Sequence, residues 1–121
     1  MTWSLRVAAL AALTVLIAAA PSRAEEVDLK LVLAADVSRS VDDREFKLQR
    51  EGYAAAFRDP RVMQAIRSGP LGKIAVCFFE WSGTESQTVI IDWTVIGDIE
   101  SAGYFSERLL RAPRSAANRT A

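Results

Sequence analysis

The stretch "LVLAADVSRSVDD" (residues 31–43) decides the fold. A run of apolar residues ends at Asp36, and Ser38 and Ser40 follow at alternate positions. An apolar run with polar residues directly after it is typical of a strand in a buried sheet. In open α/β sheets, ligands bind at the carboxyl ends of strands. The stretch therefore indicates an α/β fold and a candidate site in one segment.

Turn signals and hydrophobic periodicity divide the chain into strands and helices. Strands are predicted at 27–36, 73–81 and 87–94, and helices at 40–57, 59–69 and 97–111. The first two strands are separated by helical segments, so they should be parallel with a right-handed crossover. The third follows a loop of hairpin length and should run antiparallel at an edge. The predicted class is α/β, with two parallel strands, an antiparallel edge strand and flanking helices.

Residues at the predicted helix ends indicate how two of the helices begin and end. Ser40, with Asp43 three residues later, resembles a capping box at the start of the first helix. Asp59 suits the cap of the second helix, Pro60 its first position and Gly69 its end. Ser40 is therefore expected to cap a helix, and this role is compatible with a second role as a ligand.

The first predicted strand is apolar on both faces between residues 29 and 35. Strands of this kind usually have neighbours on both sides. With three strands, one edge of this strand has no neighbour, and an exposed apolar edge favours aggregation. We therefore expect that further strands belong to this domain and that residues 25–121 are its N-terminal part.

Residues 1–24 have the pattern of a secretory signal peptide. Arg6 precedes an apolar run at 7–20, and the small residues Ser22 and Ala24 suit a cleavage site. The apolar run is shorter than the ~20 residues that span a membrane, so we expect no stable span after cleavage. An uncleaved anchor is the alternative. The pattern predicts an exported protein, periplasmic or secreted.

Composition excludes several classes of function. The chain holds 15 basic and 15 acidic residues, and Arg6 and Arg23 lie in the leader, so residues 25–121 carry a slight negative charge. This balance argues against a nucleic-acid or anionic-membrane partner. The absence of histidine excludes His-dependent triads and His-ligated zinc. The one cysteine, Cys77, lies in an apolar run and is expected to be a buried, inert thiol.

The candidate site offers oxygen donors only. Asp36, Ser38 and Ser40 provide one carboxylate and two hydroxyls, which suit Mg²⁺, with Mn²⁺ or Ca²⁺ as alternatives. A metal with a single anionic ligand stays electrophilic and can accept a carboxylate from a partner protein. Simpler readings remain open, because Ser38 suits a loop hydroxyl and Asp36 suits a bond to turn amides.

Several segments resemble a known family. "DVSRSVDDREFKLQREGYAAAFRDPRV" (36–62) resembles the start of a von Willebrand factor A-like domain, and more narrowly a family of exported bacterial proteins with that fold. "KIAVCFFEWSG" (73–83) and "VIIDWTVIGD" (89–98) lie where that narrow family has them. The resemblance covers residues 27–121. It implies a partial, Rossmann-like von Willebrand factor A-type fold and a non-enzymatic module that binds proteins through Mg²⁺.

The resemblance also implies a set of metal ligands. Asp36, Ser38 and Ser40 match the first segment of the metal-ion-dependent adhesion site (MIDAS). The second segment supplies a threonine, for which Thr120 is the natural match and Ser115 a weaker one. The third segment supplies an aspartate after a further strand, and this chain ends before it. We therefore expect metal binding by this chain to be weak.

Two rival hypotheses remain. An aspartate-nucleophile phosphoryl-transfer enzyme also places an aspartate at the end of its first strand, but it needs a carboxylate where this chain has Ser38. A non-functional fragment is the other rival. Glu80 and Asp92 are expected to be solvated or strand-edge groups. Trp81 and Trp93 are expected to pack as a cross-strand pair.

Overall fold

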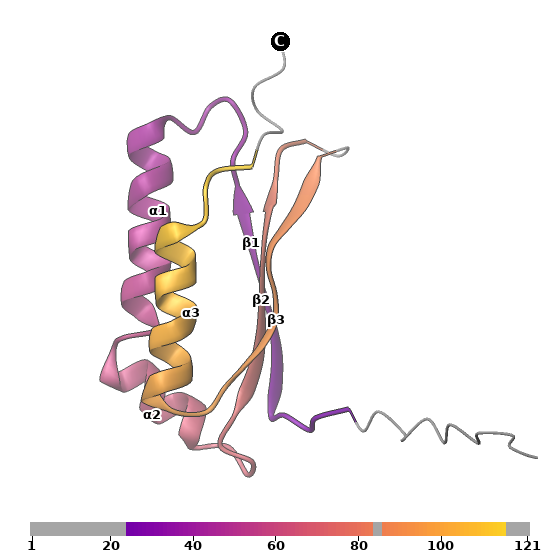
Figure 1. The fold of residues 1–121 in the computed structure, drawn as a ribbon, viewed down its shortest axis with the longest axis vertical. Coiled ribbons are helices and arrows are strands. Elements are labelled where there is room, and N and C mark those ends of the chain that lie inside the picture. Colours follow the sequence, from indigo (N-terminus) through magenta and orange to yellow (C-terminus); the bar gives the residue numbers. More distant parts are fainter. Residues whose placement is uncertain (1–23, 84–85, 116–121) are drawn as a thin grey trace, which may run out of the picture.

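The computed structural model describes residues 24–83 and 86–115. In chain order the elements are β1 (Leu29–Asp36), α1 (Asp43–Ala56), α2 (Pro60–Arg67), β2 (Ile74–Trp81), β3 (Gln87–Ile96) and α3 (Ile99–Arg111) (Figure 1). The predicted order of strands and helices is confirmed. The predicted leader, apart from Ala24, and the predicted ligand Thr120 lie outside the described residues.

The three strands form one mixed sheet in the order β1-β2-β3. β1 and β2 are parallel and in continuous register from Leu29–Ile74 to Asp36–Trp81. β3 runs antiparallel to β2, as predicted for a strand that follows a hairpin loop. Within the described residues, β1 has a neighbour on one side only. Its other edge therefore presents unpaired backbone groups.

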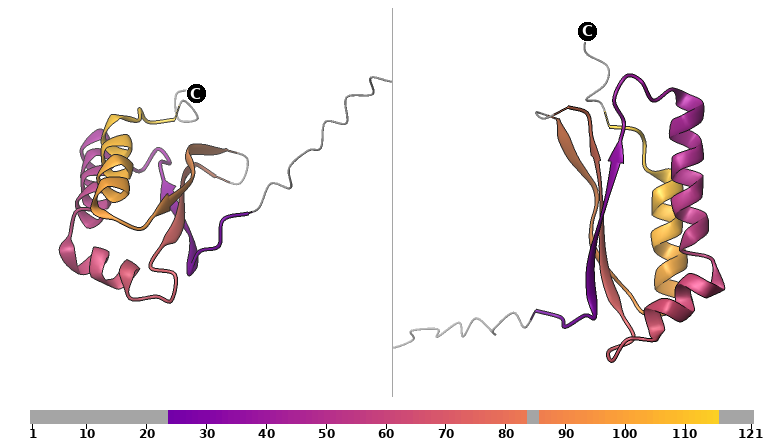
Figure 2. Two further views of the ribbon diagram at one scale, coloured as in Figure 1. Left: turned by 60° about the horizontal axis from the view of Figure 1, so that its bottom comes forward. Right: turned by 180° about the vertical axis from the view of Figure 1, so that it is seen from behind.

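All three helices lie on one face of the sheet, and α1 and α3 run side by side across it (Figure 2). The core between these layers is formed by apolar side chains of the inner sheet face and of the helices. Phe78 and Phe105 are both fully buried. Phe78 contacts the ring of Tyr53 and Phe105 that of Phe57, both edge-to-face, with centroids 5.5 and 4.8 Å apart. The first contact packs α1 against the sheet, and the second packs α3 against the end of α1.

The cap of α1 differs from the prediction. Asp42, not Ser40, is the N-cap: its Oδ1 accepts the backbone N–H of Glu45 at 2.8 Å, and Glu45 Oε2 accepts the N–H of Asp42 at 3.0 Å. The prediction failed because a second cap-forming residue stands two positions after Ser40, and only that residue has a glutamate three positions later. The predicted start of α2 is confirmed, with Asp59 as its cap and Pro60 at its first turn, while the helix ends at Arg67 with Ser68 rather than Gly69 as its C-cap.

The outer face of the sheet carries exposed apolar side chains, including Val32 and Val89. The predicted Trp81–Trp93 pair is wrong, because Trp81 lies opposite Gln87 while Trp93 is farther along β3. The short hairpin and a register irregularity in the ladder set this alignment, and neither is visible in the alternation of residues. No helix within residues 24–83 and 86–115 is long and apolar enough to cross a membrane.

Candidate metal centre

The topology brings several chain segments to one end of the sheet (Figure 1). β1 ends there, α1 begins there, and the segment after α3 returns to it. The ladder between β1 and β2 continues one residue past β1, because the N–H of Val37 donates to the carbonyl of Trp81 at 2.9 Å. Val37 is completely buried. The chain leaves the sheet at the next residue and forms the site loop, which we define as residues 36–41.

The polar side chains of the site loop lie close together. Asp36 Oδ1 accepts the backbone N–H of Ser38 at 2.8 Å, and the hydroxyl oxygens of Ser38 and Ser40 are 3.1 Å apart. Two hydrogen bonds from Ser38 lower the pKa of Asp36 below its usual range. The bond from the Ser38 side chain has the larger effect, and the bond from its backbone the smaller one. Asp36 is therefore a carboxylate at neutral pH. The structure thus joins the three predicted first-segment residues in one small polar cluster.

The donor set of the site loop fits a hard cation. One carboxylate and two hydroxyls are oxygen ligands, and Mg²⁺ commonly completes its octahedron with water. Among the described residues, no three Asp, Glu, Cys or His side chains form a metal-binding group. A cation held by Asp36, Ser38 and Ser40 would therefore rely on hydroxyls and water for most of its ligands.

Of the two residues proposed for the second segment, only Ser115 is described. Its backbone N–H donates to Glu80 Oε2 at 2.7 Å, which holds it beside the end of β2. Its hydroxyl oxygen is buried and has no hydrogen-bond partner among the described residues. The structure therefore places Ser115 near the carboxyl ends of the strands, while Thr120 is outside the described residues.

Sequence reasoning missed a buried ion pair next to the site. Arg50 and Glu80 are only 3% and 1% exposed, and Arg50 Nη2 donates to Glu80 Oε1. The prediction that Glu80 is solvated is therefore wrong, because Glu80 shares the helix-covered face of β2 with Phe78. Its partner could have been noticed: Arg50 lies four residues after Phe46 and three before Tyr53, on the apolar stripe of α1. Asp92, in contrast, is exposed as predicted.

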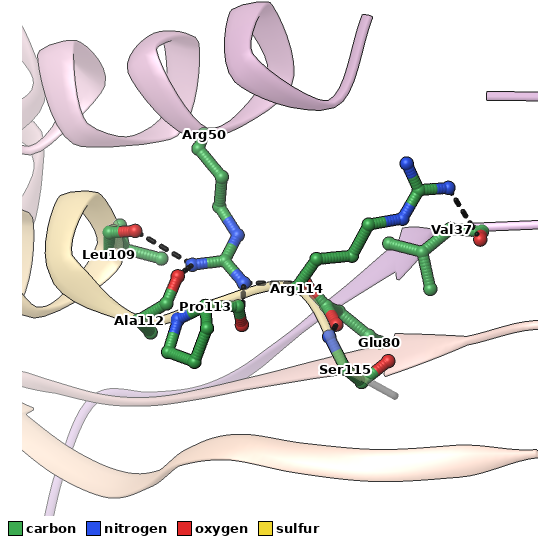
Figure 3. Close-up of polar contacts among 8 residues, drawn as sticks. All are labelled: Val37, Arg50, Glu80, Leu109, Ala112, Pro113, Arg114 and Ser115. Carbon is green, nitrogen blue, oxygen red and sulfur yellow. Dashed lines mark hydrogen bonds and ion pairs between the residues drawn. The ribbon is translucent and has the colours of Figure 1, made fainter. Parts of the chain in front are cut away.

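Arg50 also binds the end of α3 (Figure 3). Its Nη1 donates to the carbonyls of Leu109 at 2.7 Å and Ala112 at 3.0 Å, and its Nη2 approaches the carbonyl of Pro113 at 3.4 Å. Leu109 lies in the last turn of α3, whose carbonyls have no intrahelical partners, and Ala112 and Pro113 follow the helix. The ion pair therefore anchors the segment 112–115, which we call the return segment.

Arg114, in the return segment, binds the site loop directly. Its Nη2 donates to the carbonyls of Val37 at 2.9 Å, Ser38 at 3.3 Å and Val41 at 2.8 Å; Figure 3 shows the first of these bonds. Its guanidinium also lies over the ring of Phe46, 5.3 Å from the centroid. The return segment and the site loop therefore form one connected unit.

These features define a mixed α/β protein with a compact polar site at the carboxyl end of its first strand. The chain belongs to the family described as "Protein of unknown function (DUF1194)", whose sequence model matches residues 26–121. Comparison with curated proteins and with solved structures found no match.

Proposed function

We propose that this protein is an exported binding module with a von Willebrand factor A-like fold, which binds a partner protein through Mg²⁺ held by Asp36, Ser38 and Ser40. One observation carries the proposal: the Asp36 carboxylate and two hydroxyls, the latter 3.1 Å apart, gather at the carboxyl end of the parallel strand pair. This is the position at which open α/β sheets bind ligands. The module acts by binding, without catalysis.

The chemistry of the site follows from its low charge. Asp36 is the single carboxylate of the donor set, so a bound Mg²⁺ keeps a net positive charge. Such a cation attracts an aspartate or glutamate of a partner, whose carboxylate completes the coordination. Thr120 is proposed as the fourth ligand from this chain, with Ser115 as the alternative.

The unpaired edge of β1 supports a second part of the proposal. Val32 on this strand is half exposed although it is apolar, and β1 has no neighbour on its outer side within the described residues. We infer that further strands pair with this edge in a longer form of the domain and supply the third metal-site segment.

A phosphoryl-transfer enzyme remains the competing hypothesis. Enzymes that use an aspartate nucleophile need an acid–base carboxylate near it, and here the residue two positions later is Ser38, whose hydroxyl contacts Ser40. Phosphatase activity that disappears in Asp36→Asn would support it against the binding module.

The proposal is tested by titrating Mg²⁺ and Mn²⁺ into the purified protein while the melting temperature is followed. A ligand that binds only the folded state raises the melting temperature as its concentration rises. We expect a rise in the parent protein and none in Asp36→Ala. Asp92→Ala is the matched control, because Asp92 is an exposed acid on β3. An equal rise in Asp36→Ala, or no rise in the parent at any metal concentration, would contradict the proposal.

A further inference from the structure

We infer that Arg114 is a positioning residue for the metal site: it holds the backbone of the site loop and makes the site select Mg²⁺ over Ca²⁺. The inference rests on the proposed function, because it concerns the same site. It starts from one contact: a single amino group of Arg114 lies within hydrogen-bond distance of the carbonyls of Val37, Ser38 and Val41.

The contact determines the direction in which the site loop presents its oxygens. Three backbone carbonyls converge on Arg114 Nη2, so these oxygens face the guanidinium. The carbonyl of Ser38 is tied further by the N–H of Val41 at 2.9 Å. Three carbonyls of the site loop are therefore turned toward Arg114, while Asp36, Ser38 and Ser40 offer a cation the side-chain oxygens of the loop.

The charge of Arg114 strengthens this selection. The positive charge of the Arg114 guanidinium lies on the carbonyl side of the loop. A metal ion cannot share these carbonyls with it. Ca²⁺ takes six to eight oxygens and commonly uses backbone carbonyls, whereas Mg²⁺ takes six and keeps several waters. Withdrawing the carbonyls therefore disfavours Ca²⁺ more than Mg²⁺.

Arg114 is itself held in place through the residues that precede and follow it in the sequence. The residue before it, Pro113, is within reach of Arg50, and the N–H of the residue after it, Ser115, is bound by Glu80. Its side chain is only 20% exposed and packs on Phe46. Its Nε is buried and has no hydrogen-bond partner within the part of the chain that the structure describes, an unfavourable state that the Nη2 contacts offset. The guanidinium is therefore part of a fixed structure, unlike most surface arginines.

The experiment compares the purified parent protein with Arg114→Ala, Arg114→Lys and Arg111→Ala. Arg111 lies nearby at the end of α3 with an 81% exposed side chain, so it is the matched control. The first measurement is amide hydrogen exchange of residues 38–42 without metal. We expect exchange about tenfold faster in Arg114→Ala, because the loop loses its anchor, and no change in Arg111→Ala.

The second measurement is the ratio of Mg²⁺ to Ca²⁺ affinities, obtained by metal titration. We expect the ratio to fall about tenfold in Arg114→Ala, since removing a group that orients metal-binding residues commonly lowers metal affinity by at least that amount. Arg114→Lys keeps the positive charge and should retain most of the ratio, while its single ammonium group restores less of the loop protection. A general loss of stability would not lower this ratio in Arg114→Ala while leaving most of it in Arg114→Lys.

The two measurements separate the possible failures. If the parent binds metal and Arg114→Ala changes neither exchange nor the ratio, the inference is wrong while the proposed function stands. If the parent binds neither Mg²⁺ nor Ca²⁺, the proposed function and the selectivity role are both wrong, and amide exchange alone decides the positioning role. Unchanged exchange in Arg114→Ala would then reject that role as well.

Discussion

Arg50 and Glu80 lie 30 positions apart in sequence and form an ion pair that is almost completely buried. Glu80 uses its second oxygen to accept the N–H of Ser115, and Arg50 uses its second amino group for the carbonyls at the end of α3. Each member of the pair therefore binds the other and the return segment. The ion pair connects α1, β2 and the segment after α3 in a single network.

We expect Glu80→Ala to be strongly destabilising. Removing one partner leaves the buried charge of Arg50 unpaired, which costs about 3–5 kcal/mol of the free energy of unfolding. Urea denaturation followed by circular dichroism measures this change. Asp92→Ala is the control and should change the free energy by no more than ~0.5 kcal/mol, because Asp92 is exposed. Equal effects of the two substitutions would show that the ion pair does not stabilise the fold.

Asp42 and Ser40 are expected to separate stability from metal binding. Asp42→Ala removes the cap of α1 and should lower the free energy of unfolding by about 1 kcal/mol. Ser40→Ala should change it by less than ~0.5 kcal/mol, since Ser40 does not cap the helix, but should weaken the response to Mg²⁺. Thermal melts with and without Mg²⁺ measure both quantities. A large loss of stability in Ser40→Ala would contradict this assignment of roles.

The cap of α2 should make stability depend on acid pH. Hydrogen bonds from Arg61, of which the side-chain bond has the largest effect and the backbone bond the next, lower the pKa of Asp59 to about 2. A carboxylate whose pKa is lower in the folded state contributes stability above its unfolded pKa of about 3.9 and loses it as the pH falls toward 2. Melting temperatures from pH 6 to pH 2 should therefore fall more in the parent than in Asp59→Asn. Parallel curves for the two proteins would disprove this contribution, because all other carboxyl groups are common to both.

Cys77 is expected to react slowly in the folded protein. It is buried on the central strand, and desolvation, with a smaller effect of Asp92, raises the pKa of its thiol. Little thiolate forms at neutral pH, and the thiolate is the reactive species. Alkylation followed by mass spectrometry at pH 7.5 should be much slower in native protein than in urea. Similar rates in both conditions would mean that the thiol is accessible in the fold.

The sequence predicted the elements well because each has a strong local signal. The apolar run before Asp36 and the Asp59–Pro60 helix start depend on neighbouring residues only, and both were confirmed. The grouping of Asp36, Ser38 and Ser40 was also accessible, because all three belong to a single loop at a strand end.

The errors share a different cause, which is dependence on distant or competing residues. Glu80 is buried because Arg50 reaches it from another element, and no local pattern around Glu80 reports this. The alignment of Trp81 depends on an irregular β2–β3 register. Arg114 binds the site loop across most of the chain, so its role appears only after folding brings the return segment to the end of the sheet.

The bond from Arg114 to Val37 spans 77 positions and has a consequence for the order of events during synthesis. The site loop leaves the ribosome early, but its backbone anchor arrives only after α3 has been made. Closing so long a loop comes late in folding, since its entropic cost must be met before the contact contributes. A nascent chain therefore exposes the site loop before Arg114 has been made, and the loop reaches its final backbone geometry only after α3 is in place.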